Sequence, residues 1–82
     1  MFANKFLTVF RDSEGNICKK VYDNDYFEDK YDCYLMADKW FDFIVKFKSF
    51  RAISITFYNN NKRVLCLKAR FDYLCSGENF YE

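Results

Sequence analysis

Residues 52–69 read AISITFYNNNKRVLCLKA, and this stretch decides the fold. Apolar and polar side chains alternate on both sides of the turn-forming segment 59–62 (NNNK), as they do in strands with one buried face. The segment therefore predicts a β-hairpin. Its predicted buried face consists of Ile53, Ile55, Phe57, Leu65, Leu67, Ala69 and Phe71. Its predicted outer face consists of Ser54, Thr56, Tyr58, Cys66, Lys68, Arg70 and Asp72.

Upstream of this hairpin, residues 25–48 carry the periodicity of an amphipathic helix. The predicted core row consists of Tyr34, Ala37, Phe41, Ile44 and Lys48. Asp25, followed three residues later by Glu28, fits a capping box, and the acids of residues 23–32 suit the positive end of the helix dipole. Because further apolar residues widen the stripe, we expect the helix to be covered on more than one side. These residues are Cys33, Met36, Phe43 and Val45.

The N-terminal part of the chain predicts a second hairpin. Residues 5–11 (KFLTVFR) and 17–22 (ICKKVY) have strand character, and the turn formers of residues 12–16 include Gly15. Phe6 and Phe10 compete with Leu7 and Val9 for the buried face of the first strand, so the sequence leaves that face open.

Together these elements predict an α+β fold of order ββαββ, in which one amphipathic helix packs on a small antiparallel sheet. The 82 residues are too few for a second core, so residues 1–82 are expected to form a single domain. Residues 76–82 are expected to fray unless Phe80 or Tyr81 docks.

The charges of the sequence are segregated although the net charge is only +1. Residues 23–42 carry seven acids against two lysines, whereas residues 43–70 carry seven bases and no acid. The folded molecule is therefore expected to be dipolar. Eleven Phe, seven Tyr and one Trp offer more aromatic surface than one helix and a small sheet enclose, so some rings are expected to face solvent or a partner.

The sequence lacks the residues that catalysis and metal binding ordinarily need. It has no His, and its four Cys are 15, 33 and 9 residues apart, far from zinc-ligand spacing. Its two glycines, Gly15 and Gly77, form no phosphate loop. We therefore expect no catalytic residue, no metal and no cofactor, and the protein is not expected to be an enzyme.

The start of the chain and its apolar runs bear on its compartment. The first residues, MFANKFLTVFRDSEG, show no signal peptide, and no apolar run reaches the length of a membrane span. We expect a cytoplasmic protein of a bacterial or virus-infected cell, without membrane contact and with free thiols, although a disulfide is not excluded.

Two surfaces are candidates for recognition. The acidic and aromatic candidate has rings that suit a partner's pocket and carboxylates that suit a basic groove; it consists of Asp25, Tyr26, Phe27, Glu28, Asp29, Tyr31 and Asp32. The basic candidate pairs cations with a ring, as single-stranded nucleic acid requires; it consists of Tyr58, Lys62, Arg63, Lys68 and Arg70.

The leading functional hypothesis is a small non-catalytic protein-binding module that occludes a partner through the acidic and aromatic candidate. The heavy use of Asn, Asp, Lys, Phe and Tyr reflects A/T-rich codons, and a short chain of this kind is typical of phage or mobile-element inhibitors of host proteins. A nucleic-acid-binding host complex such as a defence nuclease is one such partner. Direct nucleic-acid binding by the basic candidate and a structural homo-oligomer are the alternatives, and the oligomeric state stays open.

Overall fold

The computed structural model describes residues 1–47, 50–69 and 80–81, and these residues form the predicted α+β arrangement. The elements are β1 (Lys5–Arg11), β2 (Ile17–Tyr22), α1 (Lys30–Phe47), β3 (Arg51–Asn59), β4 (Lys62–Ala69) and β5 (Phe80–Tyr81). The order ββαββ is confirmed, and the two-residue β5 extends it at the C-terminal end. Of the segment expected to fray, Phe80 and Tyr81 pair with β4, and the rest lies outside the described residues.

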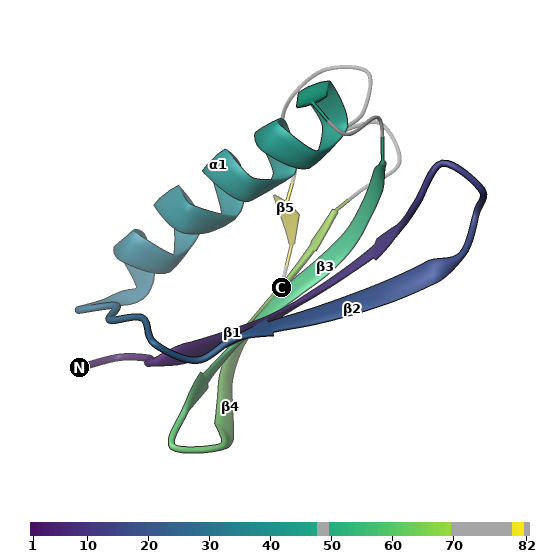
Figure 1. The fold of residues 1–82 in the computed structure, drawn as a ribbon. Coiled ribbons are helices and arrows are strands. Elements are labelled where there is room, and N and C mark those ends of the chain that lie inside the picture. The colour runs from purple at the N-terminus through teal and green to yellow at the C-terminus, as the bar shows by residue number, and fades with distance from the viewer. Residues whose placement is uncertain (48–49, 70–79, 82) are drawn as a thin grey trace.

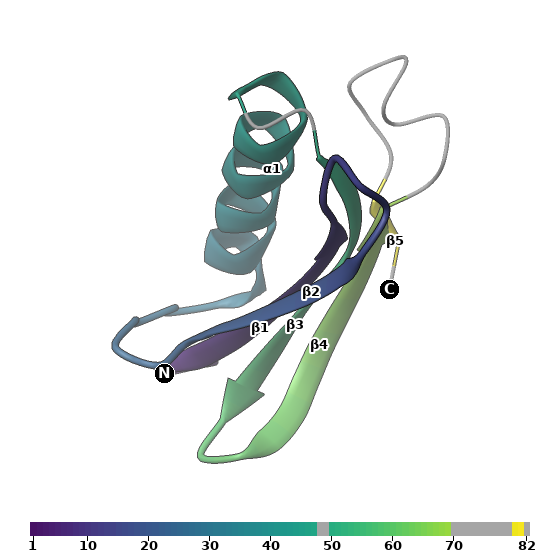
Figure 2. The same cartoon turned by 45° about the vertical axis from the view of Figure 1, so that its right-hand side comes forward.

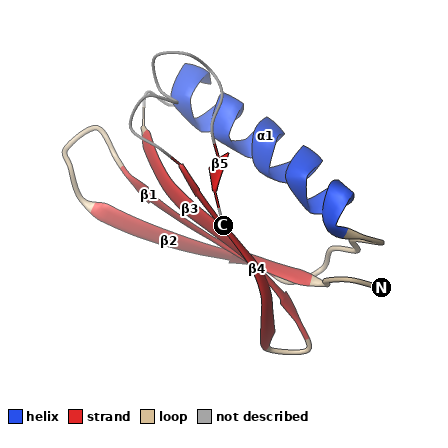
Figure 3. Ribbon diagram, turned by 180° about the vertical axis from the view of Figure 1, so that it is seen from behind, coloured by secondary structure: helices blue, strands red, loops and turns tan. Residues whose placement is uncertain are grey.

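All strands belong to one antiparallel sheet with the order β2-β1-β3-β4-β5. Because β2 and β3 both run antiparallel to β1, they run parallel to each other, and α1 makes the crossover between them. Figure 1 shows α1 lying along one face of the sheet, and the rotated views in Figures 2 and 3 show the same two layers. Among the described residues, no element covers the opposite face.

The core lies between α1 and the facing side of the sheet. Phe6 and Thr8 of β1 are buried there. The buried side of β1, which the sequence did not decide, is therefore the side of Phe6 and not that of Leu7 and Val9. Phe57 of β3 packs edge-to-face on Phe27, with ring centroids 5.1 Å apart. Within residues 30–46 the helix contributes four buried residues: Cys33, Ala37, Phe41 and Ile44. The predicted positions Ala37, Phe41 and Ile44 are therefore confirmed, and large rings supply much of the core of this short chain.

The helix phase differs from the prediction at one flank. Tyr34 was expected in the core row but is 36% exposed, whereas Cys33, one position earlier, is fully buried. Phe43, expected to be covered, is 47% exposed. The prediction that α1 is covered on more than one side is therefore wrong for Phe43, because within residues 1–47, 50–69 and 80–81 the sheet is the layer that packs on the helix.

The helix also begins later than predicted. The expected start at Asp25 with Glu28 as capping partner is wrong, because α1 begins at Lys30. Asp29 is the cap: its Oδ1 accepts the backbone N–H of Asp32 at 3.1 Å, and Asp32 Oδ2 accepts the backbone N–H of Glu28 at 2.9 Å. The capping chemistry is thus the predicted one, displaced by four residues.

Two β-bulges interrupt the predicted alternation. Ser54 pairs with Val9 but Ala52 pairs with Phe10, so Ile53 is an extra residue in β3. Ala52 is buried in its place, which corrects the expectation for Ile53. Val64 is likewise an extra residue in β4. Leu65 and Leu67 face the core as predicted, whereas residues 70–72 lie outside the described residues.

The two hairpin turns use residues that tolerate positive φ. Gly15 has φ 85° in the turn between β1 and β2. In the two-residue turn between β3 and β4, Asn60 and Asn61 have φ 49° and 71°, as the right-handed twist of a hairpin requires. This second turn is anchored to the N-terminal segment, because the backbone N–H of Asn60 donates to Asn4 Oδ1 at 3.2 Å.

Candidate functional site

The side of the sheet that faces away from α1, the open face, is arranged in cross-strand rows. Residues directly opposite one another in adjacent strands share a face, so the register defines these rows. The first row, next to the turn between β3 and β4, is Lys5, Tyr58 and Arg63, and the second is Val21, Leu7, Thr56 and Cys66. The third row is Lys19, Val9, Ser54 and Lys68. The fourth row is Ile17, Arg11 and Arg51.

Three of the four rows of the open face carry cations. Six of its residues are cationic, namely Lys5, Arg11, Lys19, Arg51, Arg63 and Lys68. The row of Val21, Leu7, Thr56 and Cys66 is uncharged, and its Thr56 is buried with Oγ1 donating to Cys66 Sγ at 3.4 Å. This row is the apolar centre of the face, and the rows on both sides of it carry cations.

Strands β1 to β4 as a whole contain eight Lys and Arg residues and no acid: two bases each in β1 and β2, one in β3 and three in β4. The acids of the described residues lie instead in the turn after β1, in residues 23–29 and on α1. The dipole expected from the sequence thus separates basic strands from the acidic segment 23–29, since α1 itself carries three acids and three bases.

Tyr58 is an aromatic residue of the open face, and a lysine lies over its ring. Lys5 Nζ is 5.6 Å from the centroid of the Tyr58 ring, within the range of a cation–π interaction. Lys5 Nζ also donates to Asn61 Oδ1. Ring and cation are thus presented together at the turn end of the face.

The residues predicted for the basic surface are only partly brought together. Tyr58, Arg63 and Lys68 lie on the open face, whereas Lys62 pairs with Asn59 at the turn, and Arg70 lies outside the described residues. The prediction missed the bases of β1 and β2. Their period-two positions gave a signal, but β1 lies between β2 and β3 only in the folded sheet.

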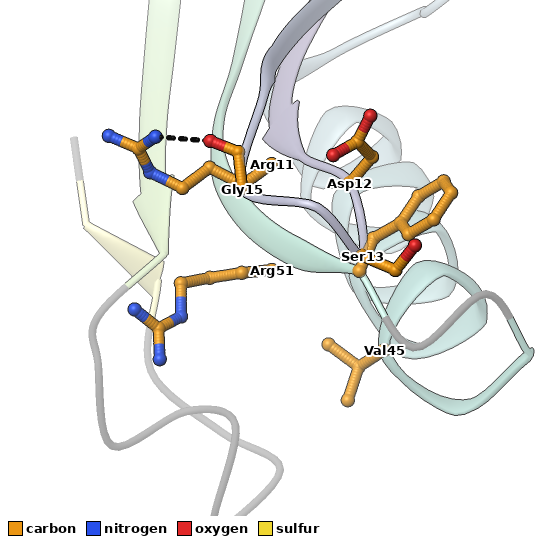
Figure 4. A pocket seen from close by; sticks show the side chains of 7 residues that line it. Arg11, Asp12, Ser13, Gly15, Val45 and Arg51 are labelled. Atoms are coloured by element: carbon orange, nitrogen blue, oxygen red, sulfur yellow. Dashed lines mark hydrogen bonds between the residues drawn. The ribbon is translucent and has the colours of Figure 1, made fainter.

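A cavity of about 460 Å³ opens where the basic face meets the turn after β1. Its lining residues include Arg11, Asp12, Ser13, Gly15 and Arg51 (Figure 4). Figure 4 shows Arg11 Nη1 donating to the carbonyl of Gly15, at 2.8 Å. Asp12 Oδ1 accepts the backbone N–H groups of Asn16 and Glu14, both at 2.9 Å, and the bond from Asn16 is the main cause that lowers the pKa of Asp12 below 3.8. This carboxylate therefore stabilises the turn.

The acidic and aromatic candidate is less available than the sequence suggested. Phe27 is buried against Phe6 and Phe57, so its expected role as an exposed anchor is wrong. Asp29 and Asp32 cap α1. Asp25 is half-buried and donates its backbone N–H to the Asn4 carbonyl at 3.4 Å.

Two tyrosines of that candidate do face outward. Tyr26 and Tyr31 are 64% and 65% exposed. The Tyr26 hydroxyl donates to Glu28 Oε1 at 2.8 Å, and this bond, together with the charge of Glu28, raises the pKa of Tyr26 above 10.0. What remains of the candidate is thus an exposed group of Tyr26, Glu28 and Tyr31.

The three cysteines of the described residues, Cys18, Cys33 and Cys66, are free thiols. Burial, with smaller effects from the charges of Asp32 and Asp29, raises the pKa of Cys33 to about 12. Within residues 1–47, 50–69 and 80–81, no three His, Cys, Asp or Glu side chains are grouped as metal ligands would be.

No helix in the described part of the chain combines the length and apolar character of a membrane span. Comparison of the chain with known protein families, with curated proteins and with solved structures finds no match.

Proposed function

We propose that this chain is a non-catalytic module that binds single-stranded nucleic acid on the open face of its sheet. The observation that carries the proposal is the charge of the open face, where six Lys and Arg residues lie on strands β1 to β4, which contain no acid. A surface of this charge attracts phosphates and gains free energy by releasing their counterions. The net charge of +1 does not oppose the proposal, since the acids of the described residues lie off the strands.

The neutral centre of the open face favours a single strand over a duplex. Leu7 is half-buried between two rows that carry cations, and Tyr58 lies in the row next to it. Bases of a single strand can pack their flat faces on such side chains while the phosphates reach the cations. In a duplex these faces are stacked within the helix and are not accessible.

The test is fluorescence anisotropy of a labelled oligothymidylate, titrated with protein at several salt concentrations from about 50 mM upward. We expect Lys68→Glu and Lys19→Glu each to weaken binding and to reduce the slope of log K against log salt by about 0.7 for each phosphate that the variant no longer neutralises. Lys39→Glu is the matched control, because it makes the same change of charge on α1, where it should alter neither affinity nor slope.

Two results would contradict this proposal. Absence of binding to the oligothymidylate at about 50 mM salt would exclude a phosphate-driven interface. A labelled duplex that binds as tightly as the single strand would show that the apolar centre does not contact bases.

A second candidate function is occlusion of a partner protein by the acidic segment 23–29 and the adjoining start of α1. The exposure of Tyr31, and of Tyr26 with its bond to Glu28, supports it, since exposed rings with carboxylates suit a basic groove that itself receives nucleic acid. A phage or mobile-element inhibitor that acts on a defence nuclease complex inside a bacterial or virus-infected cell would use a surface of this kind.

Affinity capture from host lysate, compared between the wild type and Tyr26→Ala/Tyr31→Ala, tests this second candidate. A bound protein that the double variant loses and Lys68→Glu retains would support it. A bound protein that Lys68→Glu loses and the tyrosine variant retains would instead assign the interface to the open face. The side chains of Asp29 and Asp32 are unsuitable probes, because their replacement also weakens the helix.

A further inference from the structure

Strand β2 forms an edge of the sheet with no neighbouring strand among the described residues, whereas at the other edge the two-residue β5 pairs with Lys68 and Ala69 of β4. The carbonyl of Asn16 accepts the N–H of Asp12 at 3.0 Å, and the carbonyl of Lys20 accepts the Thr8 hydroxyl at 3.1 Å. Even-numbered residues of this strand therefore turn their backbone groups toward β1. Since antiparallel pairing alternates, the N–H and C=O groups of Ile17, Lys19 and Val21 point away from the sheet.

An aromatic groove lies beside this edge, between β2 and α1. It has a volume of about 250 Å³ and is lined by Phe10, Lys20, Tyr22, Trp40, Phe43, Ile44 and Phe50. Its rings are held in place by packing: Phe10 stacks on Phe50 at 5.4 Å and meets the Trp40 ring edge-to-face at 5.9 Å. The groove is smaller than the roughly 300–1,000 Å³ of sites for drug-sized ligands, and it suits one or two inserted side chains.

Phe43 lines the helix side of the groove. Phe43 is 47% exposed on α1 although its helix packs on the sheet. A strand added next to β2 would place alternate side chains on the helix side of the sheet, level with Lys20 and Tyr22 and facing Phe43.

The charges of β2 decide which kind of strand fits. Its charged residues are Lys19 and Lys20, and Lys20 Nζ lies 5.3 Å from the centroid of the Tyr22 ring, at the groove. Antiparallel pairing with the β2 of a second copy, centred on these lysines, would set like charges opposite each other, which is destabilising. Acidic residues opposite them would be stabilising, so the edge favours an acidic strand.

We propose that β2 and the adjoining aromatic groove bind an extended acidic segment of a partner protein, which joins the sheet as an additional strand and inserts an apolar side chain against Trp40 and Phe43. The groove lies on the helix side of the sheet, opposite the open face, so this site is separate from the proposed nucleic-acid surface although β2 borders both.

The probe is a synthetic peptide that carries phenylalanine and glutamate in turn on one face of the strand and valine on the other, so that a glutamate lies opposite Lys20 when a phenylalanine enters the groove. It is added to the isotopically labelled full chain. The peptide should protect the amides of Ile17, Lys19 and Val21 from hydrogen exchange and shift the indole resonance of Trp40. Lys20→Glu should weaken its binding by about tenfold, since an attraction becomes a repulsion. Phe43→Ala should also weaken binding, with β2 intact.

Proline substitutions isolate the backbone contribution. Lys19→Pro removes an outward N–H and leaves the bonds to β1, so the domain should stay folded and lose peptide binding. Lys19→Ala is the matched control for the removed charge, and it should retain most of the affinity. Lys20→Pro removes an N–H that faces β1, so it should destabilise the hairpin and confirm which residues point outward.

Three results would overturn the proposal. The first is equal binding of a peptide with lysine in place of glutamate, and the second is equal binding by Lys19→Pro and Lys19→Ala. The third is a dimer in sedimentation experiments that Lys19→Pro dissociates, because the edge would then be covered by a second copy of this chain.

Discussion

Ala3 and Phe27 form an isolated antiparallel bridge, in which the Phe27 N–H donates to the Ala3 carbonyl at 3.0 Å and the Ala3 N–H donates to the Phe27 carbonyl at 3.2 Å. The bridge fastens the segment before α1 to the N-terminal segment. Because Phe27 is extended there, the helix cannot include it and begins at Lys30. The same bridge places the Phe27 ring in the core, edge-to-face with Phe6 at 5.8 Å.

Replacing Phe27 should therefore destabilise the whole domain. Phe27→Ala is expected to lower the free energy of unfolding by about 3–5 kcal/mol, because it leaves a cavity between Phe6 and Phe57. Tyr26→Ala is the matched control: the neighbouring ring is exposed, and its removal should cost roughly 0.5 kcal/mol or less. Urea denaturation measures both, and similar values for the two variants would mean that Phe27 is not in the core.

The helix cap can be located by comparing two aspartates. Asp29→Ala removes the acceptor of the Asp32 N–H and should lower the free energy of unfolding by about 1 kcal/mol. Asp25→Ala should cost less, because the bond of Asp25 to Asn4 is made by its backbone. A larger loss of stability for Asp25→Ala in urea denaturation would indicate that the helix begins at Asp25, as the sequence predicts.

The turn between β3 and β4 should respond to backbone conformation more than to side-chain bonds. At Asn61, with φ 71°, alanine is expected to destabilise the protein by about 1 kcal/mol. Asn61→Gly also removes the hydrogen bond from Lys5 but adopts positive φ without strain, so its melting temperature should exceed that of Asn61→Ala. Equal melting temperatures would assign the effect to the missing hydrogen bond.

Thiol labelling should separate Cys33 from Cys18 and Cys66. Burial raises the pKa of Cys33 to about 12, so its thiol is protonated and enclosed at neutral pH, and alkylation requires opening of the core. Peptide mapping after iodoacetamide treatment should find Cys33 modified last. Because the folded-state pKa lies above the ordinary 9.0, this group contributes stability below pH 9.0 that is lost as the pH rises toward 12. Labelling of Cys33 as fast as Cys18 would contradict its burial.

The turn after β1 should weaken in acid. The bonds from the Asn16 and Glu14 amides lower the pKa of Asp12 below 3.8, so its carboxylate stabilises the fold fully above that pH, and this contribution is lost as the pH falls toward the folded-state value. NMR titration should show the Asp12 carboxyl and the amides of Glu14 and Asn16 changing together. Asp12→Asn should reduce the acid sensitivity of this turn. A carboxyl that titrates at 3.8 or higher would contradict the bonding.

The sequence by itself determined the elements of this protein. Strand alternation, the periodicity around Phe41 and the turn at Gly15 depend on neighbours within a few residues, so local pattern was sufficient to predict the order ββαββ and most of the buried helix positions. The sequence also indicated the separation of acids from bases, because the two kinds of charge occupy different segments.

Only the tertiary structure decided where the elements begin, and which surfaces they share. The helix start depends on the bridge to Ala3, which lies far away along the chain, and the bulge at Ile53 depends on the register against β1. The open face likewise gathers Lys5, Lys19 and Lys68 from three strands, since β1 inserts between β2 and β3. Such pairings are non-local, and their free energy comes from burying one face of the sheet under α1, so no pattern within a single segment specifies them.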